Sequence, residues 1–362
     1  GYVGERRPTV DWMTLFGKIR VVSVYMRKAG ESAGIRPMRD HLGVEGGGQS
    51  RAVRRALTDF GIDESFGAAA AKFKEHYDTT VHRTTVRRTV LKLASHAEAF
   101  IEKKLATRAP NEEKPHLVMV QADGANAPLV VLERIEGEVT RTGRPKMKKT
   151  CTYREVRLGL AVPDDCDEPT YVAQVGAFGR FATTLALAAR HRGADDAKCT
   201  YAVTDGGIGI RERIEGALEI DQYILDKRHC RSHLLDTATE MESSDPAQQT
   251  SDWMGALKRG KVNAVIGQLD QYRGDPEAPG AERARQLGNH LTRFKDAVHY
   301  DDFVNRGLMI GSGEVESGHR HVTQRRLKIA GAWWTEENMD LIAALRSVRA
   351  NGWWDEFCRE AA

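Results

Sequence analysis

The sequence from Leu117 to Gly124, Leu-Val-Met-Val-Gln-Ala-Asp-Gly, decides the fold. Its first four residues are all apolar, which is typical of a strand buried within a sheet, and the Asp123-Gly124 pair predicts a turn where that strand ends. A second apolar run, from Thr200 to Thr204, ends in the same way at Asp205-Gly206. Both aspartates are therefore expected at the carboxyl edge of one sheet, where open α/β sheets bind their ligands.

The segments around these two strands alternate between strand and helix patterns. An apolar run at 128–132 and a strand pattern at 153–162 enclose a cationic segment at 134–150, which predicts an antiparallel meander with a basic hairpin. Helices and strands are then expected to alternate over 176–191, 200–204, 208–217, 220–225 and 227–241. This order predicts an α/β fold, a mixed sheet with helices on both faces.

These patterns divide the chain into five segments. Residues 1–48 mix basic and β-branched residues and predict a short β or irregular segment, whereas 49–110 have helical spacing. The sheet is expected within 111–242, and a polar but helical insertion follows at 243–300. Residues 301–362 predict C-terminal helices that complete the same core.

The helical segment near the N-terminus contains a pair of amphipathic helices, within 66–96, that resembles a helix-turn-helix. The turn is expected at Asp78-Thr79-Thr80, with Thr79 or Thr80 capping the second helix. That helix carries cations suited to phosphate contacts along a DNA groove, although a solvated basic face explains the same pattern. These cations are Arg83, Arg87, Arg88 and Lys92.

Two further cationic groups lie later in the chain, and both are expected to contact backbone phosphates. They are Arg141, Arg144, Lys146, Lys148 and Lys149 in the basic hairpin, and Arg320, Arg325, Arg326 and Lys328 near the C-terminus. Because 54 Lys and Arg balance 51 Asp and Glu to a net charge of +3, the distribution of charge indicates partners better than its total does.

Composition also excludes several classes of protein. The longest stretch without Asp, Glu, Lys or Arg, residues 169–179, is shorter than the ~18 residues of a membrane-spanning helix, so no membrane partner is expected. The five cysteines are odd in number and form no Cys-x-x-Cys pair, which indicates reduced thiols and a cytoplasmic location.

A third carboxylate is needed beside the two aspartates to hold metal ions. The helix that follows Gly311-Ser312-Gly313 offers Glu314 and Glu316, and Glu316 lies one turn before Arg320. Two aspartates and a glutamate suit two Mg²⁺ or Mn²⁺ ions, which prefer oxygen ligands and promote phosphoryl transfer. The alternatives are ordinary Asp-Gly turns and a surface ion pair between Glu316 and Arg320.

A secondary candidate, His229, stands four residues before a second histidine. This spacing is compatible with zinc binding, but no third ligand lies nearby in the sequence, and a role in hydrogen bonding explains it better.

Several stretches resemble the ISKra-type bacterial insertion-sequence transposases. The most specific is Ile310-Gly311-Ser312-Gly313-Glu314-Val315-Glu316-Ser317, followed by Gln324-Arg325-Arg326-Leu327-Lys328 and Gly331-Ala332-Trp333-Trp334. With the two Asp-Gly strands and shorter elements, the resemblance covers roughly residues 55–358 in consistent order. It implies a ribonuclease H-like catalytic domain with an Asp-Asp-Glu triad formed by Asp123, Asp205 and Glu316. Glu314 is secondary, because the acidic residue of the family follows the valine.

The resemblance implies a DNA transposase that cleaves DNA with two Mg²⁺ or Mn²⁺ ions and transfers the freed 3′-OH to target DNA. Its expected partners are double-stranded DNA, both element ends and target, and further copies of the chain in a homodimer or larger assembly. Its expected location is the bacterial cytoplasm, with the nucleoid when bound to DNA. The alternatives are a metal-dependent nuclease or junction resolvase on the same fold, and an inactive, transposase-derived DNA-binding protein.

Overall fold

The computed structural model describes residues 2–6, 9–44, 48–109, 114–176, 178–273 and 277–361. The expected boundary between residues 110 and 111 lies outside these ranges. Five short strands and a short helix form the described part of the first 44 residues: β1 (Tyr2–Arg6), β2 (Thr9–Thr14), β3 (Gly17–Val22), β4 (Tyr25–Lys28), β5 (Gly34–Ile35) and α1 (Pro37–His41).

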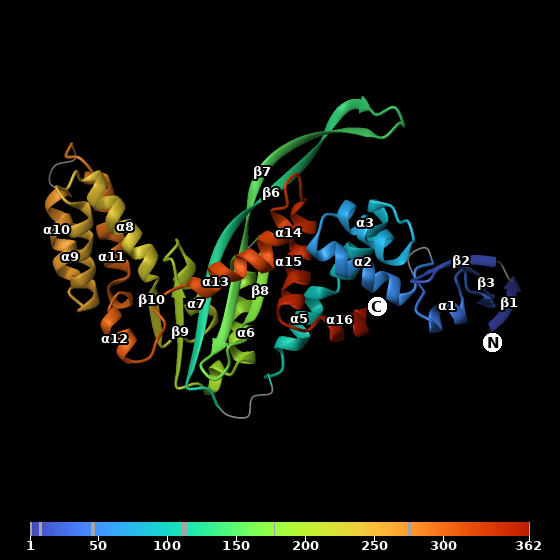
Figure 1. Ribbon diagram of the computed structural model, residues 1–362, viewed down its shortest axis with the longest axis horizontal. Coiled ribbons are helices and arrows are strands. Elements are labelled where there is room, and N and C mark those ends of the chain that lie inside the picture. The colour runs from blue at the N-terminus through green and yellow to red at the C-terminus, as the bar shows by residue number, and fades with distance from the viewer. Residues whose placement is uncertain are drawn as a thin grey trace.

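A five-stranded mixed sheet lies at the centre of the molecule, in the order β10-β9-β6-β7-β8 (Figure 1). Parallel pairing joins β9 to both β6 and β10, whereas β7 is antiparallel to β6 and β8. The strands are β6 (Leu117–Val139), β7 (Pro145–Pro163), β8 (Thr170–Val175), β9 (Cys199–Thr204) and β10 (Gln222–Leu225). This mixed α/β architecture is compatible with the expected ribonuclease H-like fold.

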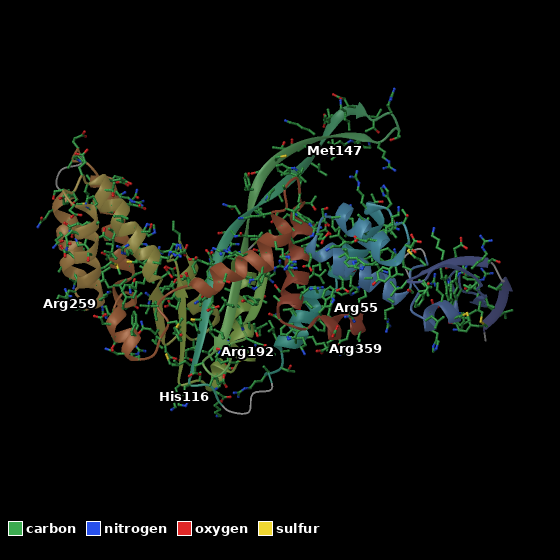
Figure 2. All side chains as sticks on the ribbon, in the orientation of Figure 1. Arg55, His116, Met147, Arg192, Arg259 and Arg359 are labelled. Carbon is green, nitrogen blue, oxygen red and sulfur yellow. The ribbon has the colours of Figure 1, made fainter. Side chains whose placement is uncertain are left out.

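The strands β6 and β7 continue beyond the sheet as a long two-stranded arm (Figure 1). The predicted basic hairpin is confirmed, because residues 134–150 form the outer part of this arm, where Figure 2 labels Met147. The prediction of separate strands at 117–124 and 128–132 is wrong, since continuous pairing with β7 makes them one strand. The third strand of the meander is β8, which the sequence pattern did not predict.

Helices cover both faces of the sheet. On one face, α6 (Phe178–His191) approaches Gly159 of β7, and α7 (Ile210–Ala217) packs beside α6. On the other face, α13 (Gly313–Gly318) lies against the neighbouring Leu158. A Cβ added at Gly318 would come within 2.9 Å of Leu158 Cδ2, so a glycine is required for this close approach of helix and sheet.

Four helices, among them the predicted pair, follow the N-terminal strands: α2 (Arg51–Asp63), α3 (Phe66–Tyr77), α4 (Arg83–Ala94) and α5 (Ala97–Leu105). The chain turns between α3 and α4 at Asp78, whose φ is 46°. The predicted cap is wrong: His82 caps α4, because its Nδ1 accepts a hydrogen bond from the Thr84 N–H.

The polar segment expected to be a helical insertion is helical where the structure describes it. With α8, its helices form a lobe beside β10 (Figure 1). The lobe comprises α8 (Lys227–Glu240), α9 (Pro246–Lys258), α10 (Val262–Arg273), α11 (Ala281–Arg293) and α12 (Tyr300–Asn305). Buried Trp253, Leu257, Leu269 and Leu287 form part of its core.

The C-terminal helices return to the centre of the molecule. After α13, a π-helical turn (His319–Gln324) leads into α14 (Arg325–Leu327), and then α15 (Glu336–Ala350) packs along β8 before α16 (Trp354–Ala361). Across the described residues, no helix is both long and apolar enough to cross a membrane.

Candidate active site

Three aspartates lie at the same level of three adjacent parallel strands: Asp123 lies within β6, whereas Asp205 and Asp226 come directly after β9 and β10. Ala122 of β6 is paired with Thr204 of β9, and Thr204 is paired with Leu225 of β10. The next residues along the chain are Asp123, Asp205 and Asp226. Because paired strands lie only about 4.8 Å apart, this register brings the aspartates of neighbouring strands side by side. The sequence led us to expect Asp123 and Asp205 at one edge of the sheet. Asp226 is a third acid at the same level, and sequence reasoning missed it.

A short backbone hydrogen bond holds each of the first two carboxylates. Asp123 Oδ1 accepts from the Gly124 N–H at 2.7 Å, and Asp205 Oδ1 accepts from the Gly207 N–H at 2.9 Å. The Asp123 side chain keeps 29% of its surface exposed, so a ligand from solvent can reach it.

Asp226 is buried, and it joins the strand edge to the helix that carries Glu316. Its Oδ2 accepts from the Ser312 N–H at 2.5 Å and from Ser312 Oγ at 2.9 Å, while its Oδ1 accepts from the His229 N–H at 2.6 Å. Burial alone would raise the pKa of Asp226, but the hydrogen bonds from His229 and Ser312 outweigh burial and lower the pKa to about 2. Asp226 is therefore a permanently charged anchor.

Gln121 of β6 supplies the second anchor for the same helix. Its Nε2 donates to the Gly311 carbonyl at 3.0 Å, and its Oε1 accepts from the Val315 N–H at 2.9 Å. The Ser312 side chain makes no cap of its own for α13. Gln121 therefore satisfies one of the free N–H groups that every helix start presents. Since Gln121 stands two residues before Asp123, on the same side of the strand, the clamp places Glu316 close to Asp123.

The charges of the three predicted acids act on one another. Burial, assisted by the carboxylates of Asp205 and Glu316, raises the pKa of Asp123 to about 6, against the opposing effects of the Gly124 hydrogen bond and the charge of His229. The pKa of His229 is raised, chiefly by its hydrogen bond to Asp226 and also by Asp205 and Glu316. The structure thus gathers Asp123, Asp205, Glu316 and His229 into one electrostatic site.

The side chains of this site do not close around a single point. Among the residues that the structure describes, no three His, Cys, Asp or Glu side chains are close enough to hold one metal ion. The donor set nevertheless fits a hard divalent cation in its chemistry, because it consists of carboxylate oxygens, and the charges of Asp205 and Glu316 act on Asp123.

Glu314, the secondary candidate, lies away from the aspartates. It lines a separate hollow with Met119, Tyr201 and Met309, and its charge, after burial, contributes to a raised pKa of Tyr171. Of the two glutamates on α13, Glu316 is the one whose charge acts on Asp123.

His319 is a second residue that sequence reasoning missed. It begins the π-helical turn, and its Nε2 lies 3.6 Å from Asp123 Oδ2. Its side chain is 2% exposed, and Nε2 has no hydrogen-bond partner in the described part of the chain. Burial lowers the pKa of His319 to about 4, so the ring is neutral at pH 7. The feature that points to a functional role of His319 is its place in a π-helical turn, because such turns occur frequently at functional sites.

All the predicted phosphate-binding cations except Arg326 are exposed. They lie on three surfaces: α4, the arm, and the C-terminal cluster of Arg320, Arg325 and Lys328. The prediction that Arg326 contacts DNA phosphates at the surface is wrong, because Arg326 is only 1% exposed. Its Nε donates to the Gly61 carbonyl, and its guanidinium lies over the rings of Phe66 and Trp334.

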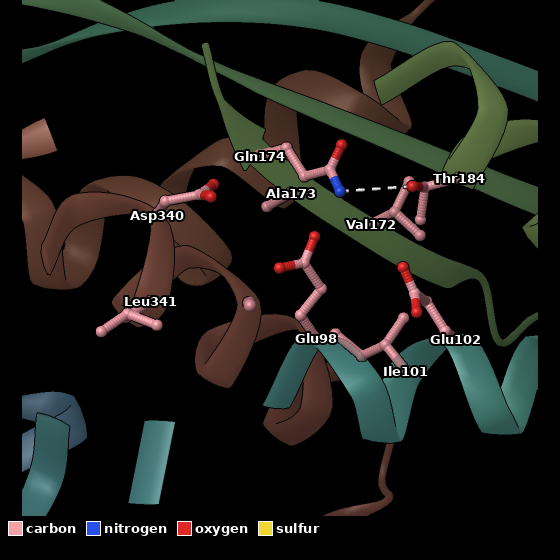
Figure 3. A pocket seen from close by; sticks show the side chains of 10 residues that line it. Glu98, Ile101, Glu102, Val172, Ala173, Gln174, Thr184, Asp340 and Leu341 are labelled. Carbon is pink, nitrogen blue, oxygen red and sulfur yellow. Dashed lines mark hydrogen bonds between the residues drawn. The ribbon is translucent and has the colours of Figure 1, made fainter. Parts of the chain in front are cut away.

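A small acidic hollow lies apart from these residues, between α5, β8 and α15 (Figure 3). Its volume of about 30 Å³ leaves room for roughly one water molecule. Arg180 donates to Glu98 and to Asp340, and Asp340 also accepts from the Val175 N–H at 2.8 Å. These carboxylates therefore hold α15 against the sheet, and the hollow is too small for a substrate.

No protein-family model and no curated protein matches this sequence. One solved structure to which the chain is similar is the Drosophila P element transposase strand transfer complex, with 10% sequence identity and a TM-score of 0.30. The match covers 90% of this chain and 84% of that chain. At this TM-score the likeness carries no argument about fold or function.

Proposed function

We propose that this chain is a DNA transposase of an insertion sequence, which cleaves DNA and transfers the freed 3′-OH with Asp123, Asp205 and Glu316. One observation carries the proposal: Asp123 and Asp205 follow paired positions of adjacent parallel strands, and their carboxylates share an electrostatic site with Glu316. Carboxylates at this edge of an α/β sheet are suited to divalent cations and to phosphoryl transfer.

The protein part of the mechanism is positioning. Asp123, Asp205 and Glu316 would hold two Mg²⁺ or Mn²⁺ ions, which when bound activate the attacking oxygen and stabilise the leaving oxygen of an in-line displacement. Gln121 and Asp226 hold the start of α13 through Gly311, Ser312 and Val315, and this support would keep Glu316 beside the two aspartates. His229 adds a positive charge next to the carboxylates when it is protonated.

The DNA would be held by the three cationic surfaces that α4, the arm and the C-terminal cluster present. Arg and Lys side chains on such surfaces contact phosphates and fix the orientation of a duplex without reading its sequence. The proposal includes a homodimer or larger assembly on DNA, since two element ends have to be processed together.

A strand-transfer assay with Mg²⁺ tests the proposal. Labelled duplexes taken from both flanks of the coding sequence are incubated with an unlabelled plasmid, and cleavage and joining are measured separately. We expect Asp205→Asn and Glu316→Gln to abolish both reactions. Two matched controls should retain them: Asp195→Asn, which changes an exposed acid before β9, and Glu314→Gln, which changes the glutamate of α13 that lies away from the aspartates.

The outcomes separate the alternatives. Full activity of Asp205→Asn would exclude this mechanism. Cleavage without joining would favour a nuclease or resolvase, and DNA binding without cleavage in Mg²⁺ or Mn²⁺ would favour an inactive DNA-binding protein.

A further inference from the structure

A hollow of about 570 Å³ lies where the N-terminal helices, the base of the arm and the loop before α15 meet. This volume is within the range of roughly 300–1,000 Å³ that small-molecule sites occupy. Its lining combines rings, aliphatic side chains and cations from these three regions. The lining includes Phe66, Arg87, Leu132, Lys149, Arg326 and Trp333.

The loop between α14 and α15 presents Trp333 to this hollow in a fixed position. Its neighbour Trp334 is buried, donates from Nε1 to the Leu327 carbonyl at 3.1 Å, and accepts at its own carbonyl from the Val130 N–H at 2.8 Å. Trp333 is 49% exposed and also lines the hollow. The buried Trp334 therefore fixes the loop, and the large ring of Trp333 stays exposed to solvent although tryptophan is usually well buried.

The arm forms a second wall, which is apolar but carries a cation. Leu132 is paired with Lys149 across β6 and β7, and Val130 is paired with Cys151, so all four side chains share one face of the arm. Leu132 is 45% exposed. Arg87 of α4 contributes a further positive charge to the lining.

An unsatisfied donor lies at the inner side of the hollow. Arg326 lines it and is 1% exposed, yet its Nη2 has no hydrogen-bond partner among the described residues. A buried guanidinium nitrogen without an acceptor is costly for a folded protein, so it indicates an acceptor that comes from a ligand.

We infer that this hollow binds one unpaired nucleotide of DNA, with its base stacked on Trp333 and its phosphate held by Arg87 and Lys149. The inference deepens the proposed function and rests on it. An aromatic face beside cations is the general arrangement that binds single-stranded nucleic acid, and stacking tolerates any base. An oxygen or nitrogen acceptor of the base would satisfy Arg326 Nη2. An apolar peptide or lipid would leave three cations beside the site without a counter-charge.

Binding of fluorescent DNA duplexes at fixed salt tests the inference. The probes are a blunt duplex, the same duplex with a four-nucleotide 3′ overhang, and the same overhang with abasic sites in place of its bases. A 2-aminopurine in the overhang reports stacking through fluorescence quenching. The variants are Trp333→Ala and Trp333→Phe, and the matched control is Phe16→Ala, which removes a fully exposed ring outside the hollow.

We expect the unchanged protein to bind the overhang about tenfold more tightly than the blunt or abasic probe, and to quench 2-aminopurine. Trp333→Ala should lose this preference and the quenching, with blunt-duplex affinity unchanged within about twofold. Trp333→Phe should retain most of the preference, since phenylalanine still offers a ring, and Phe16→Ala should behave as the unchanged protein.

Three results would overturn the inference. They are equal affinity of the unchanged protein for overhang and blunt probes, equal affinity for base-bearing and abasic overhangs, and an undiminished preference in Trp333→Ala. In each of these cases DNA is still bound, and the proposed function stands. Failure of the unchanged protein to bind any of the duplexes would overturn both proposals.

Discussion

Replacement of Gln121 by methionine should loosen the start of α13 while leaving the sheet folded. The change keeps the length and volume of the side chain but removes its hydrogen bonds to the Gly311 carbonyl and the Val315 N–H. A lost helix cap costs about 1 kcal/mol, and each buried backbone group without a partner costs about 1–3 kcal/mol. The closed form of α13 should therefore be destabilised by about 2–4 kcal/mol.

Hydrogen exchange measured by mass spectrometry reads this change locally. Since 1.36 kcal/mol corresponds to a tenfold change in an equilibrium constant, amides in a peptide covering residues 311–318 should exchange roughly 30 to 1,000 times faster. The matched control is Gln174→Met, which changes a buried glutamine on β8 with one bond to Thr184 Oγ1 at 3.2 Å. The control should leave exchange in residues 311–318 unchanged.

The same variant should lose metal-dependent DNA cleavage, because Glu316 would no longer be held next to Asp123. Unchanged exchange in residues 311–318 would refute the clamp. Faster exchange with full cleavage activity would refute the argument that the clamp positions Glu316 for catalysis.

Three further predictions concern charge and burial. Without divalent cations, Asp123→Asn should raise the melting temperature at pH 8 but not at pH 4. Burial raises the pKa of Asp123 to about 6, so ionisation of this carboxyl between about pH 4 and 6 opposes folding. Equal shifts of the melting temperature at both pH values would contradict this. Burial lowers the pKa of His290 to about 4, so the protein loses stability as the pH falls from 6.5 toward 4. Thermal unfolding at several pH values should show that His290→Phe loses less stability over this interval. Parallel curves of melting temperature against pH for the two proteins would contradict this. Arg326→Ala should lower the free energy of unfolding by about 2–3 kcal/mol, because a hydrogen bond and ring contacts are lost. Replacement of the exposed Arg325 by alanine should leave stability unchanged and weaken DNA binding. Equal stabilities of the two variants would refute the buried role of Arg326.

The sequence predicted Asp123 and Asp205 because an apolar run that ends in Asp-Gly is a local pattern. Asp226 occupies the equivalent place after β10, but its strand has only four residues and Lys227 follows it in place of glycine. No local pattern therefore marked Asp226, although the register of three strands makes its position plain. Gln121 was missed for a related reason, since a single polar residue within a strand does not reveal its partner 190 residues later.

The C-terminal cations show what a cluster of charges in the sequence cannot tell. Arg325 is exposed, whereas the adjacent Arg326 is buried, with its guanidinium over the rings of Phe66 and Trp334. Phe66 and the Gly61 carbonyl, which accepts from Arg326 Nε, lie far from Arg326 in the sequence. Strand β8 was missed because all six of its residues are buried, so it lacks the alternation that marks a half-exposed strand.

The contribution of tertiary structure to the site is thus mainly one of support. Local patterns predicted Asp123 and Asp205 and offered Glu314 and Glu316, and the resemblance favoured Glu316. The residues that hold the start of α13 come from strands and loops far apart in the sequence. Such contacts become visible only when the strands are in register, which sequence periodicity alone does not specify.

Anomalous diffraction from crystals soaked in Mn²⁺ with bound DNA tests the central claim most directly. We predict two manganese peaks about 3.5–4 Å apart, with Asp123, Asp205 and Glu316 as ligands. The Asp205→Asn variant should lose at least one of the peaks. A structure that binds DNA but shows no manganese at these carboxylates, or shows it on Glu314 instead, would contradict the account.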